Sequence, residues 1–124
     1  MNQRTTLICG ATIAALAVII GAFGAHELQQ FLQTNGRSDT FETAVRYQFY
    51  HAFAMLITGI LMTQFVSKRL PYAAILFLTG TVFFSGSLYV FCFTGVRALG
   101  AVTPLGGLLF IAGWLMLIAG VLKK

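Results

Sequence analysis

The chain has 124 residues, of which 58% are hydrophobic and only 9% are charged. A soluble domain carries about a quarter charged residues, so this composition excludes an ordinary soluble fold and is typical of a membrane protein. The net charge of +5 is spread over several parts of the chain, which indicates topology and lipid contact and argues against nucleic-acid binding. We expect one membrane domain over residues 1–124 and no separate soluble catalytic domain.

Four segments that lack Asp, Glu, Lys and Arg are each long enough to cross a bilayer. They are residues 5–25, 47–67, 70–96 and 98–122. About 20 helical residues cover the hydrocarbon layer, which is about 30 Å thick. The sequence therefore predicts an all-α integral membrane protein that forms a bundle of four transmembrane helices.

The first helix is expected over residues 5–25, where small residues recur every three or four positions along one face. They are Gly10, Ala14, Ala17, Gly21 and Ala25. Small residues at this spacing allow a neighbouring helix to approach closely. A short outer interfacial helix is expected over residues 27–33 and should end at Asn35 and Gly36, because both residues tolerate positive φ.

The second helix is expected over residues 40–66, a length of about 40 Å that exceeds the hydrocarbon thickness. Asp39, followed three residues later by Glu42, predicts a capping box at its start. Arg46 lies one helical turn after Glu42 and is expected to pair with it or to reach lipid phosphates.

The third helix is expected over residues 72–93 and the fourth over residues 103–122, where Thr103 and Pro104 suit an N-cap and a first helical turn. Close helix packing is expected at several glycines of these helices and of the first. They are Gly21, Gly86, Gly106, Gly107 and Gly113. Replacing Gly86 or Gly107 by leucine is expected to destabilise the bundle, because closely packed backbones leave no room for the larger side chain.

The distribution of basic residues predicts the orientation of the chain. The N-terminus, the second loop and the C-terminus hold Arg4, Lys68, Arg69, Lys123 and Lys124, whereas the first and third loops hold Arg37, Arg46 and Arg97. Basic residues favour the cytoplasmic side, so both termini are expected in the cytoplasm. Cys9 and Cys92 then lie near opposite faces of the membrane, too far apart for a disulfide.

Five motifs follow one another along the chain in a specific order and spacing. They are Gly21-Ala22-Phe23-Gly24-Ala25-His26, Tyr47-Gln48 with His51-Ala52, Phe84-Ser85-Gly86-Ser87-Leu88-Tyr89, Thr103-Pro104 with Gly106-Gly107, and Gly113-Trp114. With these motifs the chain resembles, over nearly its whole length, the YgdD/YwdK-like family of small bacterial membrane proteins, a domain of unknown function (423). The resemblance implies a multi-pass protein of the bacterial inner (plasma) membrane with four helices, and it offers no catalytic residues to assign.

Because successive helices alternate in direction, the polar side chains of the four predicted helices are all expected in the same half of the membrane, the outer leaflet. This candidate ligand-binding cluster consists of His51, Tyr47, Gln48, His26, Ser85, Ser87 and Tyr89. A histidine within an apolar helix is costly unless it is paired, so His51 is a functional candidate. In one interpretation His51 binds a ligand, relays a proton or coordinates a metal. In the other it is a neutral histidine that forms a hydrogen bond with Tyr89, Ser87 or a backbone carbonyl and holds two helices together.

His26 has two interpretations of the same kind. It either pairs with His51 as a ligand of a haem or of a metal ion, or caps the end of the first helix and contacts lipid head groups. The sequence contains no residue pattern that is typical of catalysis or of a dedicated metal site. We therefore expect no enzymatic activity, no cofactor and no metal.

Three functions remain open at this stage. The first is a non-enzymatic membrane module that binds membrane lipids or a membrane-protein partner, and the small-residue helix faces favour it. The second is a homo-oligomeric transporter or channel for a small molecule or ion, with a polar path around His51. The third is a haem- or metal-binding redox protein that uses His26 and His51.

Overall fold

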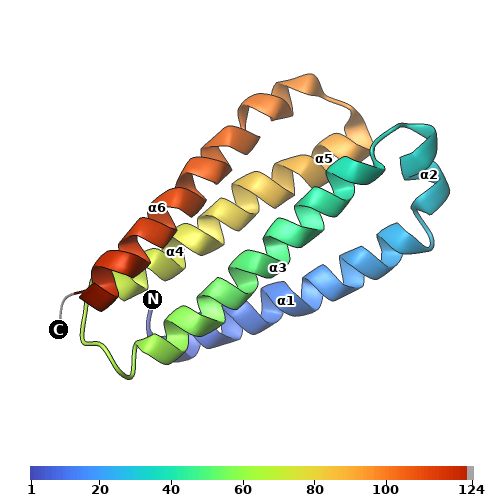
Figure 1. Ribbon diagram of the computed structural model, residues 1–124. Coiled ribbons are helices and arrows are strands. Elements are labelled where there is room, and N and C mark those ends of the chain that lie inside the picture. The colour runs from blue at the N-terminus through green and yellow to red at the C-terminus, as the bar shows by residue number, and fades with distance from the viewer. Residues whose placement is uncertain (123–124) are drawn as a thin grey trace.

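The computed structural model describes residues 1–122, and these residues form helices, turns and loops without a strand. In chain order the elements are α1 (Gln3–Ala25), α2 (Gln29–Thr34), α3 (Ser38–Leu61), α4 (Arg69–Thr81), the π-helical turn η1 (Val82–Gly86), α5 (Ser87–Thr94), the 3-10 helix η2 (Arg97–Ala101) and α6 (Thr103–Leu122). The long helices lie side by side, and α4, η1 and α5 follow one another as a single rod (Figure 1). The prediction of an all-α protein is confirmed.

Within the described residues 1–122, three helical stretches are long and apolar enough to cross a membrane: Gln3–Ala25, Arg69–Thr94 and Arg97–Leu122. The helix predicted over residues 40–66 differs, because α3 ends at Leu61. There the amide N–H groups of Thr63 and Gln64 donate to carbonyls only three residues earlier, and such tight bonds end an α-helix. The uncharged part of α3, residues 47–61, is about 22 Å long and is shorter than the hydrocarbon layer.

The third predicted helix also differs from the structure. It begins at Arg69 and not at residue 72, because Pro71 lies in the first turn, where its missing N–H would have no partner. It continues to Thr94 through the π-helical turn η1, which the apolar pattern of the sequence does not predict. π-helical turns are short insertions that occur at functional sites more often than elsewhere.

The start of α3 contradicts the predicted capping box. The helix begins at Ser38, and its N-cap residue Arg37 makes no side-chain hydrogen bond to the helix end. Asp39 therefore lies within the first turn, where its carboxylate favours the positive end of the helix dipole. Glu42 does not bond the start of the helix. It pairs with Arg46 at 3.3 Å, which is one of the two alternatives predicted for Arg46.

Two antiparallel helix pairs form the bundle, α1 with α3 and the α4–η1 rod with α6. In the second pair, glycines seven residues apart on α6 face large side chains seven residues apart on the rod. The pairs are Gly106 with Phe84, Gly113 with Phe77, and Gly120 with Leu70. An added Cβ would lie 2.8 Å from the ring of Phe77 at Gly113 and would meet the backbone of Phe84 at Gly106, so these two positions favour glycine most strongly.

The first pair is built in a similar way, with Gly10 against Leu56 and Gly59 against Leu7. Gly21 is less restricted, because an added Cβ would meet Val45 at 3.4 Å. The prediction that Gly86 and Gly107 are packing positions is wrong, since an added Cβ at either would have no neighbour within 4 Å. Gly107 follows the buried Gly106 by one residue, a rotation of about 100° that carries it off the packed face.

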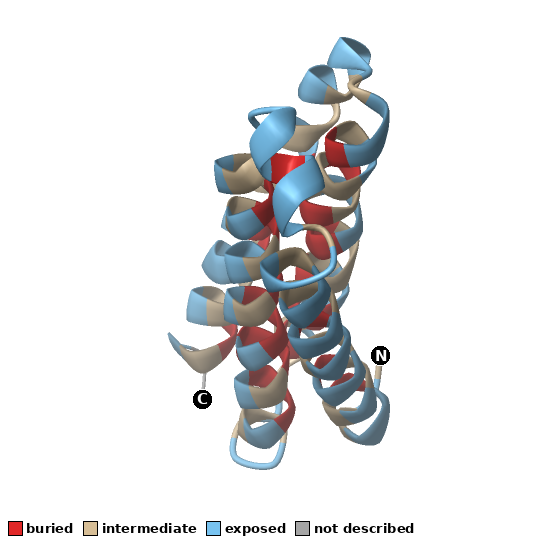
Figure 2. Cartoon of the chain, turned by 90° about the vertical axis from the view of Figure 1, so that its right-hand side faces the viewer, coloured by how far each residue is buried: buried red, intermediate tan, exposed pale blue. Residues whose placement is uncertain are grey.

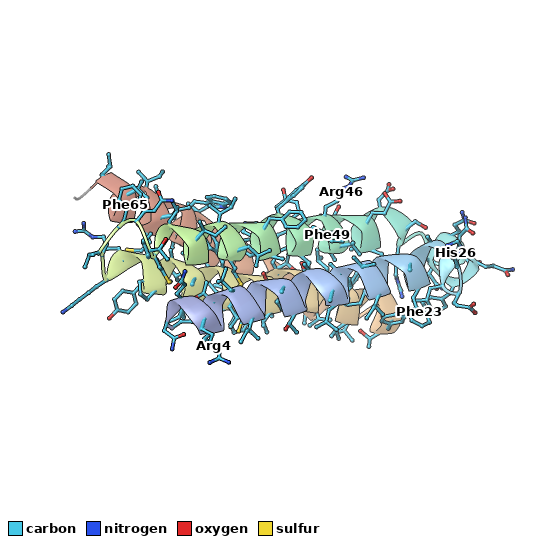
Figure 3. All side chains as sticks on the ribbon, turned by 90° about the horizontal axis from the view of Figure 1, so that it is seen from below. Arg4, Phe23, His26, Arg46, Phe49 and Phe65 are labelled. Carbon is cyan, nitrogen blue, oxygen red and sulfur yellow. The ribbon has the colours of Figure 1, made fainter. Side chains whose placement is uncertain are left out.

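The N-terminus, the end of α6 at Leu122 and the α3–α4 loop lie at one end of the bundle, and α2 and the α5–η2 connection lie at the other (Figure 1). Arg4 and Phe65 lie toward the first end and His26 toward the second (Figure 3). Lys123 and Lys124, which the orientation prediction also uses, lie outside the described residues. Buried residues gather in the interior of the bundle, and exposed residues cover its outside (Figure 2).

Candidate functional site

His51 on α3 lies buried at the contact with α6, with 4% of its surface exposed. Its Nδ1 atom is 2.8 Å from the carbonyl oxygen of Tyr47, and the indole Nε1–H of Trp114 donates to its Nε2 atom at 3.1 Å. A carbonyl only accepts and an indole N–H only donates. These partners therefore assign the neutral tautomer with the proton on Nδ1, and they occupy both ring nitrogens.

Aromatic rings enclose the imidazole of His51. The ring of Phe110 stacks on it with centroids 3.4 Å apart and an interplanar angle of 7°. Trp114 and Phe77 lie beside it, with ring centroids 5.9 Å and 5.7 Å away. The bond between His51 and the carbonyl of Tyr47 agrees with one of the predicted alternatives, a hydrogen bond to a backbone carbonyl. The residue that His51 bonds on another helix is Trp114, and not Tyr89 or Ser87.

Gln48, one turn before His51 on α3, connects three helices. Its side-chain amide donates to the carbonyl oxygen of Ile13 on α1 at 2.9 Å, and its Oε1 atom accepts from the hydroxyl of Tyr89 on α5 at 2.6 Å. Gln48 is only 4% exposed, so its amide is largely shielded from water. The bonds to Ile13 and Tyr89 replace the hydrogen bonds to water that the amide loses on burial. The amide is thus used for helix packing.

The two serines of the π-helical region bond to different helices. Ser85 in η1 donates to the carbonyl oxygen of Ala44 on α3 at 2.7 Å. The hydroxyl of Ser87 lies 2.6 Å from that of Thr103 at the start of α6. Within residues 1–122, every buried side-chain nitrogen or oxygen atom has a hydrogen-bond partner. Five members of the predicted cluster therefore bond a neighbouring helix: Gln48, His51, Ser85, Ser87 and Tyr89.

His26 lies apart from this cluster. It is exposed at the end of α1, where its backbone N–H bonds the carbonyls of Ala22 and Phe23. Because Gly10 packs against Ala52 and Leu56 in the antiparallel α1–α3 pair, His26 lies about 16 Å along the bundle from the level of His51. The structure does not bring the two histidines together, and residues 1–122 contain no group of three or more His, Cys, Asp or Glu residues that could hold a metal ion.

An open groove of about 570 Å³ lies beside His51, between α3, η1 and α6. We call it the aromatic groove, and its lining residues are Tyr47, Tyr50, His51, Phe84, Gly107, Phe110, Ile111 and Trp114. Gly107 contributes to the hollow because it has no side chain and nothing stands within 4 Å of its missing Cβ. Tyr47 and His51 belong to the cluster predicted from sequence, whereas the wall from α6 was not predicted, although Gly107, Phe110 and Trp114 recur at helical spacing.

The fold and its apolar outer surface define an all-helical membrane protein. A family model described as a protein of unknown function, DUF423, matches residues 20–107. UPF0382 membrane protein SH2409 of Staphylococcus haemolyticus is 47% identical to the chain over 121 residues, which cover 98% of both proteins. UPF0382 membrane protein YwdK of Bacillus subtilis is 38% identical over 127 residues, again with 98% of both covered.

The chain therefore belongs to the DUF423 family of membrane proteins, as its motifs predicted. No solved structure matches it significantly.

Proposed function

We propose that this protein is a non-enzymatic module of the bacterial plasma membrane that crosses the bilayer four times and holds the apolar tail of a membrane lipid in the aromatic groove. The observation that carries the proposal is the groove itself, an open hollow with aromatic walls on the outer surface of the bundle, where Tyr50, Ile111 and Trp114 are exposed. Its volume of about 570 Å³ lies within the range of about 300–1,000 Å³ that is usual for small-ligand sites.

The chemistry of the groove suits an apolar ligand. Both ring nitrogens of His51 and the indole N–H of Trp114 are already bonded to protein atoms, and the other polar groups of the side chains that line the groove are the hydroxyls of Tyr47 and Tyr50. The remaining walls offer ring faces, Ile111 and the bare backbone of Gly107. A lipid tail in this position gains dispersion contacts and leaves no protein hydrogen bond unmade.

The four-crossing topology makes α3 the fourth span. Support comes from its packing, because α3 contacts α1, α4 and η1 along its length and buries nine residues. In this topology the end that holds Arg4, Lys68 and Arg69 faces the cytoplasm, together with both termini.

A polar transport path around His51 is a weaker proposal. Gln48 and His51 direct their polar atoms to Ile13, Tyr89, Tyr47 and Trp114, so a passing ion would have to break contacts that hold the helices together. No second function is favoured by an observation of comparable weight.

The proposal is tested by native mass spectrometry of the protein released from mild detergent. We expect the wild type to retain a phospholipid molecule that Gly107→Leu retains at least about fivefold less often, because the leucine occupies the groove and its Cβ has no protein atom within 4 Å. Gly86→Leu is the matched control, since it adds the same side chain to open space outside the groove. A wild type without lipid, or equal retention in the two variants, would overturn the proposal.

A further inference from the structure

A second hollow, of about 360 Å³, lies between α1, α2 and α3 at the end of the bundle far from the termini. We call it the interfacial pocket, and it shares no residue with the aromatic groove. Its apolar lining comes from Gly21, Gly24, Ala25, Leu32, Phe41 and Val45. Its polar lining comes from Gln29, Gln33, Ser38, Glu42 and Arg46.

The apolar base of this pocket is firmly placed. Leu32 and Phe41 are 2% and 3% exposed and pack in one cluster with Cys92. The α2–α3 connection is fixed at Arg37, whose guanidinium donates to the carbonyl oxygen of Cys92 at 2.9 Å and lies over the ring of Phe91. The hollow is therefore a formed feature of the fold.

The polar side of the pocket carries one charge of each sign. Arg46 and Glu42 form an ion pair at 3.3 Å, and their side chains are 62% and 63% exposed. An exposed pair four residues apart stabilises a helix only weakly, so a ligand can separate it easily. A purely anionic ligand would meet Glu42 unfavourably, and a purely cationic ligand would meet Arg46 unfavourably.

The location of the pocket further restricts the ligand. Glu42 and Arg46 lie within the two helical turns before Tyr47. Tyrosines are enriched at the membrane–water interface, which places the charged side of the pocket near that interface. An apolar base beneath a polar rim at this depth suits an amphiphile. The pocket thus combines apolar walls, a guanidinium and a carboxylate where the head groups of phospholipids lie.

We propose that the interfacial pocket binds a zwitterionic phospholipid whose head group contains a phosphate and a primary ammonium. Arg46 donates to the phosphate, because a guanidinium matches phosphate oxygens with two parallel hydrogen bonds. Glu42 accepts from the ammonium, which a quaternary choline head group without N–H donors cannot reproduce. The glycerol and first methylene groups lie against Leu32, Phe41 and Val45.

The test measures lipid retention by native mass spectrometry, using detergent micelles doped with phosphatidylethanolamine, phosphatidylcholine or phosphatidylglycerol with identical acyl chains. We expect the wild type to retain phosphatidylethanolamine at least about fivefold better than the other two. Glu42→Gln should remove the preference over phosphatidylcholine, and Arg46→Gln should lower the retention of all three lipids. Both residues are exposed, so neither change affects the core.

Matched controls remove a charge at the same end of the bundle without touching the pocket. Asp39→Asn and Arg97→Gln alter exposed residues outside the pocket lining and should leave the preference unchanged. Gly107→Leu should also leave it unchanged, which separates this site from the aromatic groove. Equal retention of the three lipids by the wild type, a preference for phosphatidylglycerol, or an unaltered preference in Glu42→Gln would each overturn the proposal.

Discussion

The helices α3 and α6 contribute to the bundle in opposite ways. α3 buries nine residues, among them Gln48, His51 and Thr58, whereas α6 buries only four, three of which are glycines. The outer face of α6 exposes leucines and isoleucines at helical spacing, Leu108, Ile111, Leu115, Ile118 and Leu122. A central helix can carry polar groups because its neighbours satisfy them, while a peripheral helix meets lipid directly.

This difference explains why α3 is not among the stretches that are apolar enough to span a membrane. Its side chains bond Tyr89 and Trp114, and its backbone accepts from Ser85. Gln48 and His51 lower its hydropathy and also bond neighbouring helices, while the exposed charges of Asp39, Glu42 and Arg46 lower it further. In the proposed four-crossing topology, hydropathy alone would underestimate α3 because other helices shield its polar side chains from lipid.

The largest effect is expected from two neighbouring glycines of α6. Gly106→Leu should destabilise the protein by about 3 kcal/mol, because a Cβ there would meet the backbone of Phe84. Gly107→Leu should change stability by less than about 0.5 kcal/mol, because its side chain points into open space. Thermal unfolding in detergent measures both. Similar losses in the two variants would contradict the assigned packing face of α6.

A smaller effect is expected at the polar centre of α3. Gln48→Leu should cost about 2 kcal/mol, because the half-buried hydroxyl of Tyr89 loses its partner. The variant Tyr89→Phe removes that hydroxyl, and the double variant should therefore cost less than the sum of the two single changes. A double-mutant cycle measures the coupling, which should be about 0.6–1.7 kcal/mol. Full additivity would contradict the Gln48–Tyr89 bond.

The contact between α3 and α6 should contribute less. His51→Leu removes the acceptor of the Trp114 indole and should cost about 1 kcal/mol. Trp114 is the single tryptophan of the chain, so its fluorescence reports this contact directly. We expect the emission to shift to shorter wavelength once the indole N–H loses its hydrogen bond. His26→Leu is the control, and an identical shift in that variant would argue against the contact.

The smallest effect is expected on the exposed side of α3. Arg46→Gln removes the ion pair with Glu42 and should cost only about 0.3–0.5 kcal/mol, since both side chains are solvated. High salt should reduce the difference from the wild type further. Thermal unfolding at low and high ionic strength measures it, and a loss above about 1 kcal/mol would show that Arg46 has a partner other than Glu42.

The apolar stretches and the family were predictable from sequence, because charge-free windows and ordered motifs are properties of the chain alone. The end of α3 at Leu61 was not, since the tight turn at Thr63 and Gln64 lies inside an apolar window. Composition contains no signal for that turn. The π-helical turn η1 was missed for the same reason.

The composition of the candidate site was predictable, but its connections were not. His51 was recognised as a residue that needs partners, yet the choice of Trp114 over Tyr89 depends on the register between α3 and α6. Gly106 and Gly107 look equivalent in sequence, and only the rotation of α6 separates a packed glycine from one that lines a groove. Register and rotation arise from packing between helices, which one sequence does not display.

The occupancy of the aromatic groove can be measured directly through Trp114, which lines it. Phospholipid with brominated acyl chains, added to the protein in detergent, quenches indole fluorescence on contact. We expect quenching that saturates as lipid is added and is reduced at least about fivefold in Gly107→Leu but not in Gly86→Leu. Quenching that rises without saturation, or that is the same in both variants, would contradict a lipid site in the groove.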